Sequence, residues 1–211
     1  MAARPAPGNT PRAKDPRGTA VRIRAAARML FLSKGYGATS MDAVAAAAPV
    51  SKRTLYQYYA SKEDLFAAVI EEVWSAFTGA PVLSEAGEAD PRAVLHAFVQ
   101  SLVSHWERPE VIAFLRLIIA EAPRAPELSA AYFRSTKEPT VQALAAYLER
   151  LSRAGKLAGA PDPMLAAAQF MGAIKEPLFW PRVLGVPSAF PVEVATDRAI
   201  DALLSKARRA D

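Results

Sequence analysis

The chain has 211 residues and a formal net charge of +5; 52% of its residues are hydrophobic and 22% are charged. This composition supports a large buried core and excludes a disordered chain. The chain contains no cysteine, which excludes disulfides, thiol nucleophiles and thiolate metal sites.

Apolar residues recur at spacings of three and four, and Val, Ile and Thr never form alternating runs, so the sequence predicts an all-α fold. Residues 1–15 are rich in Pro and basic side chains and lack this periodicity, which predicts a flexible basic arm. The first four helices are expected at about 16–33, 40–48, 51–58 and 62–78.

The second part of the chain predicts a loop and five longer helices. The loop is expected from Gly79 to Asp90, which includes Pro81. A bend is expected at Pro139 because proline interrupts helical hydrogen bonding. The helices are expected at 91–107, 109–122, 126–154, 163–176 or a little beyond, and 191–209.

No segment has the character of a secretion signal or a membrane span. The first apolar segment is interrupted by arginines, and the most apolar stretch, 111–120, is short and contains Arg116. The sequence therefore predicts a cytoplasmic protein.

Short polar residues mark the starts of three N-terminal helices. Thr39 and Asp42 have the spacing of a capping box, and Ser51 and Ser61 can each cap the helix that follows. Pro49 ends the second helix because it has no N–H to donate and disfavours helical geometry in the residue before it. Two short helices joined by a tight break are typical of a helix-turn-helix.

The positive charge is concentrated in the first third of the chain. Residues 1–66 carry 11 basic and 4 acidic side chains, a net charge of +7, whereas the other 145 residues carry 15 basic and 17 acidic ones, a net charge of −2. This asymmetry is typical of a polyanion-binding module joined to a neutral domain. An ordinary solvated basic face is the alternative, and charge alone does not separate the two.

Residues 35–65 contain a distinctive combination: Gly35-Tyr36, Thr39-Ser40-Met41, Val44-Ala45, Ala48-Pro49-Val50-Ser51, Thr54-Leu55-Tyr56, Tyr58-Tyr59, Ser61-Lys62-Glu63 and Leu65. This combination resembles the DNA-binding domain of the TetR family of bacterial repressors. Pro49 stands where the family usually has glycine, and Tyr59 where it usually has phenylalanine. The resemblance implies a helix-turn-helix DNA-binding domain at 16–61 and a helical effector-binding and dimerisation domain at 62–211.

The third helix is the expected reader of the DNA major groove, where base edges carry a legible pattern of donors and acceptors. Lys52, Arg53 and Gln57 are the expected base-reading residues. The resemblance implies phosphate contacts from Ser40, Thr54, Tyr56, Tyr58 and Lys62, and Ser51 could donate to a phosphate besides acting as a cap. Tyr59 is expected in the core, which is also the alternative for Tyr58.

Three arginines share one face of the first helix: Arg17, Arg24 and Arg28. This face is either a phosphate-contacting stripe or an ordinary solvated surface. Arg17 is retained as a DNA-binding candidate.

The second domain contains Leu115-Arg-Leu-Ile-Ile-Ala-Glu-Ala-Pro123, Pro126-Glu127-Leu128 and Ala168-Gln-Phe-Met-Gly172. These sequence segments resemble the ligand-binding domain of the AefR-like branch of the TetR family. The resemblance implies an internal pocket and a homodimer in which the last two long helices form a four-helix bundle with their counterparts. The candidate interface residues are Leu165, Ala168, Met171, Gly172 and Leu203, for each of which packing within one subunit is the alternative.

Aromatic residues and isolated polar residues are the candidates for lining the pocket. Most aromatics at helical spacing are simply core residues, so each has that alternative. Arg116 could instead pair with an acid such as Glu121 or extend to water. The ligand-binding candidates are Trp74, Phe77, Phe98, His105, Trp106, Phe114, Arg116, Phe133, Gln169, Phe170 and Phe179.

An enzyme is not expected. His96 and His105 fall on opposite sides of one helix, and the sequence has no phosphate loop, nucleophile elbow or clustered carboxylate pair. No metal or cofactor is predicted. The sequence predicts a homodimeric repressor that leaves a palindromic operator in double-stranded DNA when it binds a small, largely apolar effector. An activator of the same fold and an effector-independent DNA-binding protein are the alternatives.

Overall fold

The computed structural model describes residues 16–77, 79–157 and 162–205. All regular structure in these ranges is helical, which confirms the predicted fold class. The predicted arm at 1–15 and the end of the predicted last helix lie outside the described residues. The elements are α1 (Pro16–Lys34), α2 (Met41–Ala47), α3 (Lys52–Tyr58), α4 (Lys62–Trp74), α5 (Gly79–Ser84), α6 (Pro91–Trp106), α7 (Pro109–Glu121), α8 (Pro126–Tyr132), the π-helical turn η1 (Phe133–Lys137), α9 (Glu138–Arg153), α10 (Pro163–Leu178), α11 (Trp180–Leu184) and α12 (Val192–Ser205).

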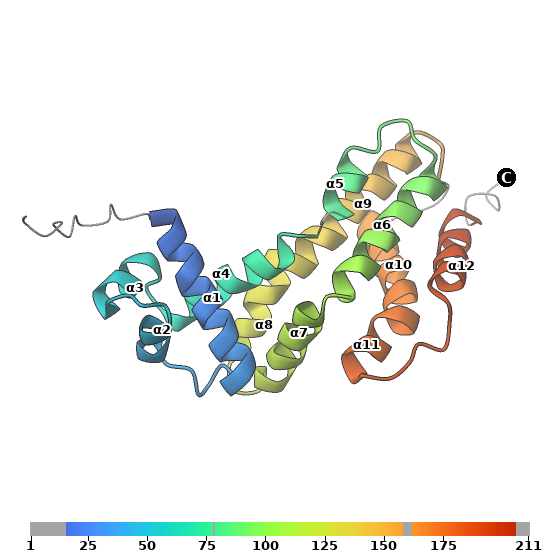
Figure 1. Ribbon diagram of the computed structural model, residues 1–211. Coiled ribbons are helices and arrows are strands. Elements are labelled where there is room, and N and C mark those ends of the chain that lie inside the picture. Colours follow the sequence, from blue (N-terminus) through green and yellow to red (C-terminus); the bar gives the residue numbers. More distant parts are fainter. Residues whose placement is uncertain (1–15, 78, 158–161, 206–211) are drawn as a thin grey trace, which may run out of the picture.

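Helices α1–α3 lie at one end of the molecule and α10–α12 at the other, with α4 leading from the first group toward the middle (Figure 1). None of the described helices combines the length and apolar character that a bilayer-spanning segment needs.

A cluster of aromatic rings joins the N-terminal helices to the rest of the molecule. Phe31 of α1, Tyr36 and Phe66 of α4 contact one another with ring centroids 5.3 to 5.5 Å apart. Phe66 also contacts Phe114 of α7, at 6.2 Å. Because all four rings are buried, one continuous core runs from α1 through α4 to α7.

Serine side chains cap the three helices that follow α1. Ser51 and Ser61 each accept a hydrogen bond from the backbone N–H three residues on, at 3.0 Å, as predicted. The cap of α2 is Ser40, whose hydroxyl accepts in the same way at 3.2 Å. The prediction of Thr39 as the cap was wrong, because Thr39 is buried and donates its hydroxyl to the carbonyl of Gly35 at 2.8 Å.

The turn between α2 and α3 has the geometry that glycine usually provides. The N–H of Val50 donates to the carbonyl of Ala45 at 3.0 Å, as in a Schellman motif. Pro49 precedes Val50 and has a φ of 26°, in the left-handed region. A proline ring favours a φ of about −65° and supplies no N–H for the second bond of the motif. Pro49 therefore separates the two helices but strains the turn.

Helix α4 is shorter than predicted, whereas helix α10 ends a little beyond residue 176, as expected. Helix α4 ends at Trp74 rather than at residue 78, and the hydroxyl of Ser75 donates to the carbonyl of Glu72 at 2.7 Å, which competes with the helical pattern. Helix α10 continues through Pro177 to Leu178, because a proline removes only one hydrogen bond and Leu178 is fully buried.

The predicted loop at 79–90 contains the short helix α5. Leu83 of α5 is fully buried, and the guanidinium of Arg150 in α9 donates to its carbonyl at 2.5 Å. These tertiary contacts outweigh the weak helical propensity of a segment that includes Gly79 and Pro81.

The predicted bent helix at 126–154 is a continuous path through α8, η1 and α9 (Figure 1). The distortion predicted at Pro139 takes the form of the π-helical turn directly before it. The missing N–H and bulky ring of proline disturb the regular hydrogen bonds of the preceding turn, which widens to accommodate them.

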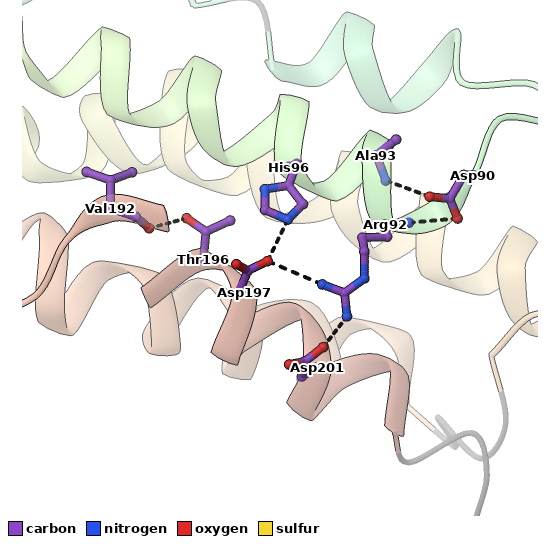
Figure 2. Close-up of polar contacts among 8 residues, drawn as sticks. All are labelled: Asp90, Arg92, Ala93, His96, Val192, Thr196, Asp197 and Asp201. Atoms are coloured by element: carbon purple, nitrogen blue, oxygen red, sulfur yellow. Dashed lines mark hydrogen bonds and ion pairs between the residues drawn. The ribbon is translucent and has the colours of Figure 1, made fainter. Parts of the chain in front are cut away.

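Ionic contacts attach α12 to α6 (Figure 2). The guanidinium of Arg92 in α6 pairs with Asp201 and, at 3.3 Å, with Asp197, and the ring of His96 lies 2.9 Å from Asp197. Asp90 caps the start of α6 through the N–H of Ala93 at 3.2 Å. These contacts fix α12 beside the N-terminal half of α6.

We predict that Pro49→Gly stabilises the protein. Glycine adopts the left-handed turn without strain and restores the missing N–H, so the free energy of unfolding should rise by about 1–2 kcal/mol. Urea denaturation followed by circular dichroism measures this change. Pro49→Ala is the matched control, because it restores the N–H but keeps a Cβ that is unfavourable at this φ, and it should gain less. A lower denaturation midpoint for Pro49→Gly would contradict the assignment of strain.

Candidate DNA-binding surface and ligand cavity

Helix α3 is attached to the core by one face and exposes the other. Leu55 is fully buried, whereas Lys52, Arg53, Tyr56 and Gln57 are exposed. These four positions recur at spacings of one and four along the helix, which places them on one side of it. The three predicted base-reading residues therefore share a free surface, together with Tyr56.

The two cations of this surface differ in their surroundings. The ammonium of Lys52 lies 2.5 Å from a carboxylate oxygen of Asp42 in α2, so it is paired with a neighbouring acid. Arg53 is exposed and pairs with no acid among the described residues. Arg53 is therefore the cation of α3 that is available to a DNA base without first leaving a partner.

The residues predicted to contact phosphates divide into exposed and internally bonded groups. Arg17, Ser40 and Tyr56 are exposed. The hydroxyl of Thr54 lies 2.8 Å from that of Ser51. These two hydroxyls form one short polar pair at the start of α3.

Tyr58 and Lys62 bind backbone carbonyls of the same domain. The Tyr58 hydroxyl donates to Pro16 at 3.1 Å, which connects α3 to the start of α1, although the ring is 36% exposed. The ammonium of Lys62 donates to the carbonyls of Tyr36 and Thr39 at 3.0 and 3.1 Å and lies 4.2 Å from the Tyr36 ring centroid. In this structure Lys62 therefore holds the α1–α2 loop.

The predicted stripe on α1 is divided by the tertiary structure. Arg24 pairs with Glu72 of α4 and donates to the hydroxyl of Tyr59 at 3.1 Å. Arg28 pairs with Glu110 of α7 at 3.0 Å. Both arginines thus connect α1 to helices that follow α3. The prediction of a solvated or phosphate-facing stripe was wrong for them.

A cavity of about 40 Å³ lies between α4, α6, η1, α9 and α10. Its aromatic side is made of rings in mutual contact: Trp74 lies 5.7 Å from His105 and 5.4 Å from Tyr132, and Phe77 lies 5.6 Å from His105, between centroids. The lining residues are Trp74, Phe77, Leu102, His105, Trp106, Tyr132, Thr136, Lys137, Thr140, Val141, Met171 and Lys175.

Four of the predicted pocket residues line this cavity: Trp74, Phe77, His105 and Trp106. The other seven do not. Phe98, Phe114, Phe170 and Phe179 are buried in the core, and Phe133 and Gln169 are exposed. Arg116 donates to the carbonyls of Val183 and Arg182, at 2.7 and 3.1 Å, and so caps the end of α11.

The spacing of apolar residues identifies the buried face of a helix. It does not identify which residues of that face line a cavity. The polar lining from η1 and α9, namely Thr136, Lys137 and Thr140, carried no signal in the sequence. Lys175 was visible as a cation within an apolar helix, and it does line the cavity.

The cavity contains polar groups that burial has perturbed. His105 is 5% exposed and neither of its ring nitrogens has a hydrogen-bond partner among the described residues. Burial, aided by the charge of Arg108, lowers the pKa of His105 to about 4, so the ring is neutral near pH 7. Burial and the charge of Lys137 lower the pKa of Lys175 to about 8. Burial raises the pKa of Tyr132 to about 12.

A row of exposed apolar side chains runs along α10. Leu165 is 54% exposed and Met164 45%, and Ala168 and Gly172 lie on the same open side. A Cβ added at Gly172 would meet no atom within 4 Å. Of the other predicted interface residues, Leu203 is partly buried and Met171 is turned inward, where it lines the cavity.

Both groups of helices match known sequence families. Residues 23–69 match the family described as bacterial regulatory proteins, tetR family. Residues 93–206, more than half of the chain, match the C-terminal domain of AefR-like transcriptional repressors. The first match contains α2, α3 and the capped start of α4, and the second contains nearly all of α6 to α12.

Curated relatives are transcriptional regulators. The HTH-type transcriptional regulator TcmR of Streptomyces glaucescens is 34% identical over 116 residues, which are 52% of this chain and 50% of TcmR. The HTH-type transcriptional repressor NicS of Pseudomonas putida is 29% identical over 94 residues, 44% of each chain. The chain thus spans about half the length of the curated relatives it matches, or less.

Solved structures with the same fold cover nearly the whole chain. A protein of Mesorhizobium loti, described as a TetR-family transcriptional regulator, has a TM-score of 0.76 and 27% identity, covering 91% of this chain and 98% of that one. The flavonoid-responsive regulator FrrA has a TM-score of 0.72 and 34% identity, covering 91% and 96%.

We predict that His105 makes the protein less stable in mild acid. Its pKa falls from the usual 6.5 to about 4 on folding, so between these values the unfolded chain binds the proton more readily. The stabilising effect of a neutral ring is therefore present above pH 6.5 and is lost as the pH falls toward 4, at a cost of up to roughly 3 kcal/mol.

Urea denaturation at several pH values tests this effect. His105→Gln should lose less stability over the window than the wild-type protein does. An equal loss in the two proteins would contradict a neutral, buried His105.

Proposed function

Since the chain belongs to the TetR family of bacterial transcriptional regulators, we propose that it is a repressor that binds a palindromic operator as a homodimer. Residues 16–61 form the DNA-binding domain and residues 62–211 the effector-binding and dimerisation domain. Entry of a small molecule into the cavity releases the DNA. The observation that carries this proposal is that α4 begins at the helix-turn-helix and ends with Trp74 in the cavity wall.

The DNA-binding half rests on the free surface of α3. A recognition helix must present side chains to base edges while its own domain holds it rigidly. Leu55 packs α3 against the core, and Tyr58 and Ser51 stabilise its two ends. Arg53 and Gln57 are the base-reading candidates, with Lys52 joining them when it leaves Asp42. Arg17, Ser40 and Tyr56 are the phosphate-binding candidates.

Dimerisation rests on α10 and α12. The exposed row on α10 is apolar and includes small residues, which allow close approach of a second helix. A helix-turn-helix monomer reads only half of a palindrome, so two copies are needed to bind one operator firmly. The ionic contacts of Arg92 with Asp197 and Asp201 hold α12 in place beside this face.

A chain of charged contacts connects the cavity wall to α1. Arg108 donates to the carbonyl of Val73, the residue before Trp74, at 2.9 Å. Arg108 also lies 3.7 Å from Glu110, and Glu110 pairs with Arg28 of α1. A shift of α4 near Trp74 therefore disturbs contacts that position α1 and the domain it belongs to.

The small size of the cavity supports coupling between ligand and DNA. A volume of about 40 Å³ is less than a single aromatic ring requires, given that an engineered cavity of about 150 Å³ is needed to hold benzene. A ligand must therefore displace lining side chains, which include Trp74 at the end of α4. A ligand that fits only the displaced arrangement shifts the protein toward it, which is the condition for allosteric release.

Similarity to FrrA, which is described as flavonoid-responsive, supports a small-molecule effector for this chain as well. An activator would use the same parts, because activation or repression depends on the position of the operator. Reporter expression from the promoter beside the gene, with and without the protein, separates the two. Lower expression in its presence identifies a repressor.

Arg53→Ala tests the reading surface. Loss of a good bidentate base contact should weaken binding to the operator by about 1–3 kcal/mol and leave binding to random DNA nearly unchanged. Gel-shift titrations with the intergenic DNA beside the gene and with random DNA of equal length measure both. Arg153→Ala, which removes an exposed cation distant from α3, is the control. An equal loss on both DNAs would show that Arg53 only attracts phosphate.

Leu165→Glu tests the dimer. A carboxylate at this exposed apolar position would be buried without a partner in the dimer, so the variant should have the mass of a monomer by light scattering. It should also lose operator binding in gel shifts. Met29→Glu, at an equally exposed apolar position on α1, is the control for the mass measurement. A dimeric Leu165→Glu protein would place the interface elsewhere.

A further inference from the structure

Two lysines line the cavity, and no acid within the described ranges does. Lys175 of α10 is partly buried, with its ammonium 5.1 Å from the ring centroid of Phe179. Lys137 of η1 is exposed, and its ammonium lies 4.8 Å from the ring centroid of Phe133. Neither ammonium pairs with a carboxylate among the described residues, and the lining contains no Asp or Glu. The cavity is therefore positively charged at one side.

An unpaired, partly buried ammonium is unfavourable. Removal from water disfavours its charge, and a second cation nearby adds repulsion, which is why the pKa of Lys175 is lowered to about 8. An aromatic ring beneath the ammonium offsets only part of this cost. An anion bound in the cavity would offset both contributions, so the charge of Lys175 and Lys137 selects for a negatively charged ligand.

Much of the remaining lining is aromatic. Trp74, Phe77 and Trp106 contribute flat apolar surfaces, and rings prefer to contact other rings edge-on or offset. His105 lies among them, and neither of its ring nitrogens has a partner in the part of the chain that the structure describes. A neutral imidazole has one donor and one acceptor, so it can bind a polar substituent on the ring of a ligand.

We infer that the effector is an aromatic carboxylate, whose anion binds Lys175 with Lys137 nearby and whose ring lies against Trp74, Phe77 and Trp106. A polar ring substituent such as a hydroxyl pairs with His105. This inference rests on the proposed function, because it names the class of molecule that the same cavity binds. An uncharged hydrocarbon leaves the lysines and His105 unpaired, and an aliphatic anion leaves the aromatic side without a matching surface.

Binding of four probes to the purified protein, without DNA, tests the inference. The probes are benzoate and 2-naphthoate, each compared with its uncharged amide, and quenching of tryptophan fluorescence reports binding because Trp74 and Trp106 line the cavity. At least one carboxylate should bind roughly ten- to a hundredfold more tightly than its amide, as expected for a charge-assisted contact. Equal affinity for acid and amide in both pairs would overturn the inference.

Variants locate the contact. Lys175→Gln should bind the carboxylate no more tightly than the amide while binding the amide as the wild type does. Lys175→Met serves the same purpose if the glutamine variant folds poorly, because it keeps the length and apolar character of the side chain. Lys156→Gln is the control, since Lys156 pairs with Glu88 outside the cavity lining. Unchanged preference for the carboxylate in both Lys175 variants would overturn the inference.

Operator release is measured separately. If a carboxylate binds through Lys175 but leaves gel-shift affinity for the operator unchanged, the inference about the cavity stands and the proposed coupling to DNA fails. If the protein binds no operator and yet distinguishes acid from amide, the ligand class again stands and the repressor proposal fails. The two proposals can therefore be refuted independently.

Discussion

The burial of helix α4 by two groups of helices is the constraint on which the rest of the structure depends. Near its start, Phe66 is packed among Phe31 of α1, Tyr36 and Phe114 of α7. Near its end, Trp74 contacts His105 and Tyr132 beside the cavity. A helix packed this closely at both ends moves as a rigid element, because protein interiors do not deform continuously. In the proposed function, α4 therefore carries a change in the cavity to the helix-turn-helix.

Charged contacts make this mechanical connection specific. Arg24 and Arg28 of α1 pair with acids on α4 and α7. Arg108 contacts both the carbonyl of Val73 and Glu110. Such contacts are directional, so they distinguish one placement of α1 from another. Arg24 and Arg28 are candidate phosphate contacts by sequence, but in the structure they hold the DNA-binding domain at a defined position.

The cavity contains polar groups whose burial costs stability. His105 has no hydrogen-bond partner and Lys175 no counter-ion among the described residues, and each arrangement is less stable than an apolar side chain of similar size would be. Both residues face the same small space. Polar groups left unsatisfied by the protein itself are the groups that a ligand can satisfy, which connects the local cost in stability to recognition.

The sequence by itself determined the helical class, the capped helix-turn-helix and the exposed face of α3. These features depend on residues close together in the chain, such as the serine caps, Pro49 and the spacing around Leu55, so local patterns suffice to predict them. Only the tertiary structure decided which side chains line the cavity, that Arg24 and Arg28 bridge helices, and that Met171 points inward. These outcomes depend on how buried helices rotate against each other, and a helix with apolar residues on most of its surface does not specify that rotation locally.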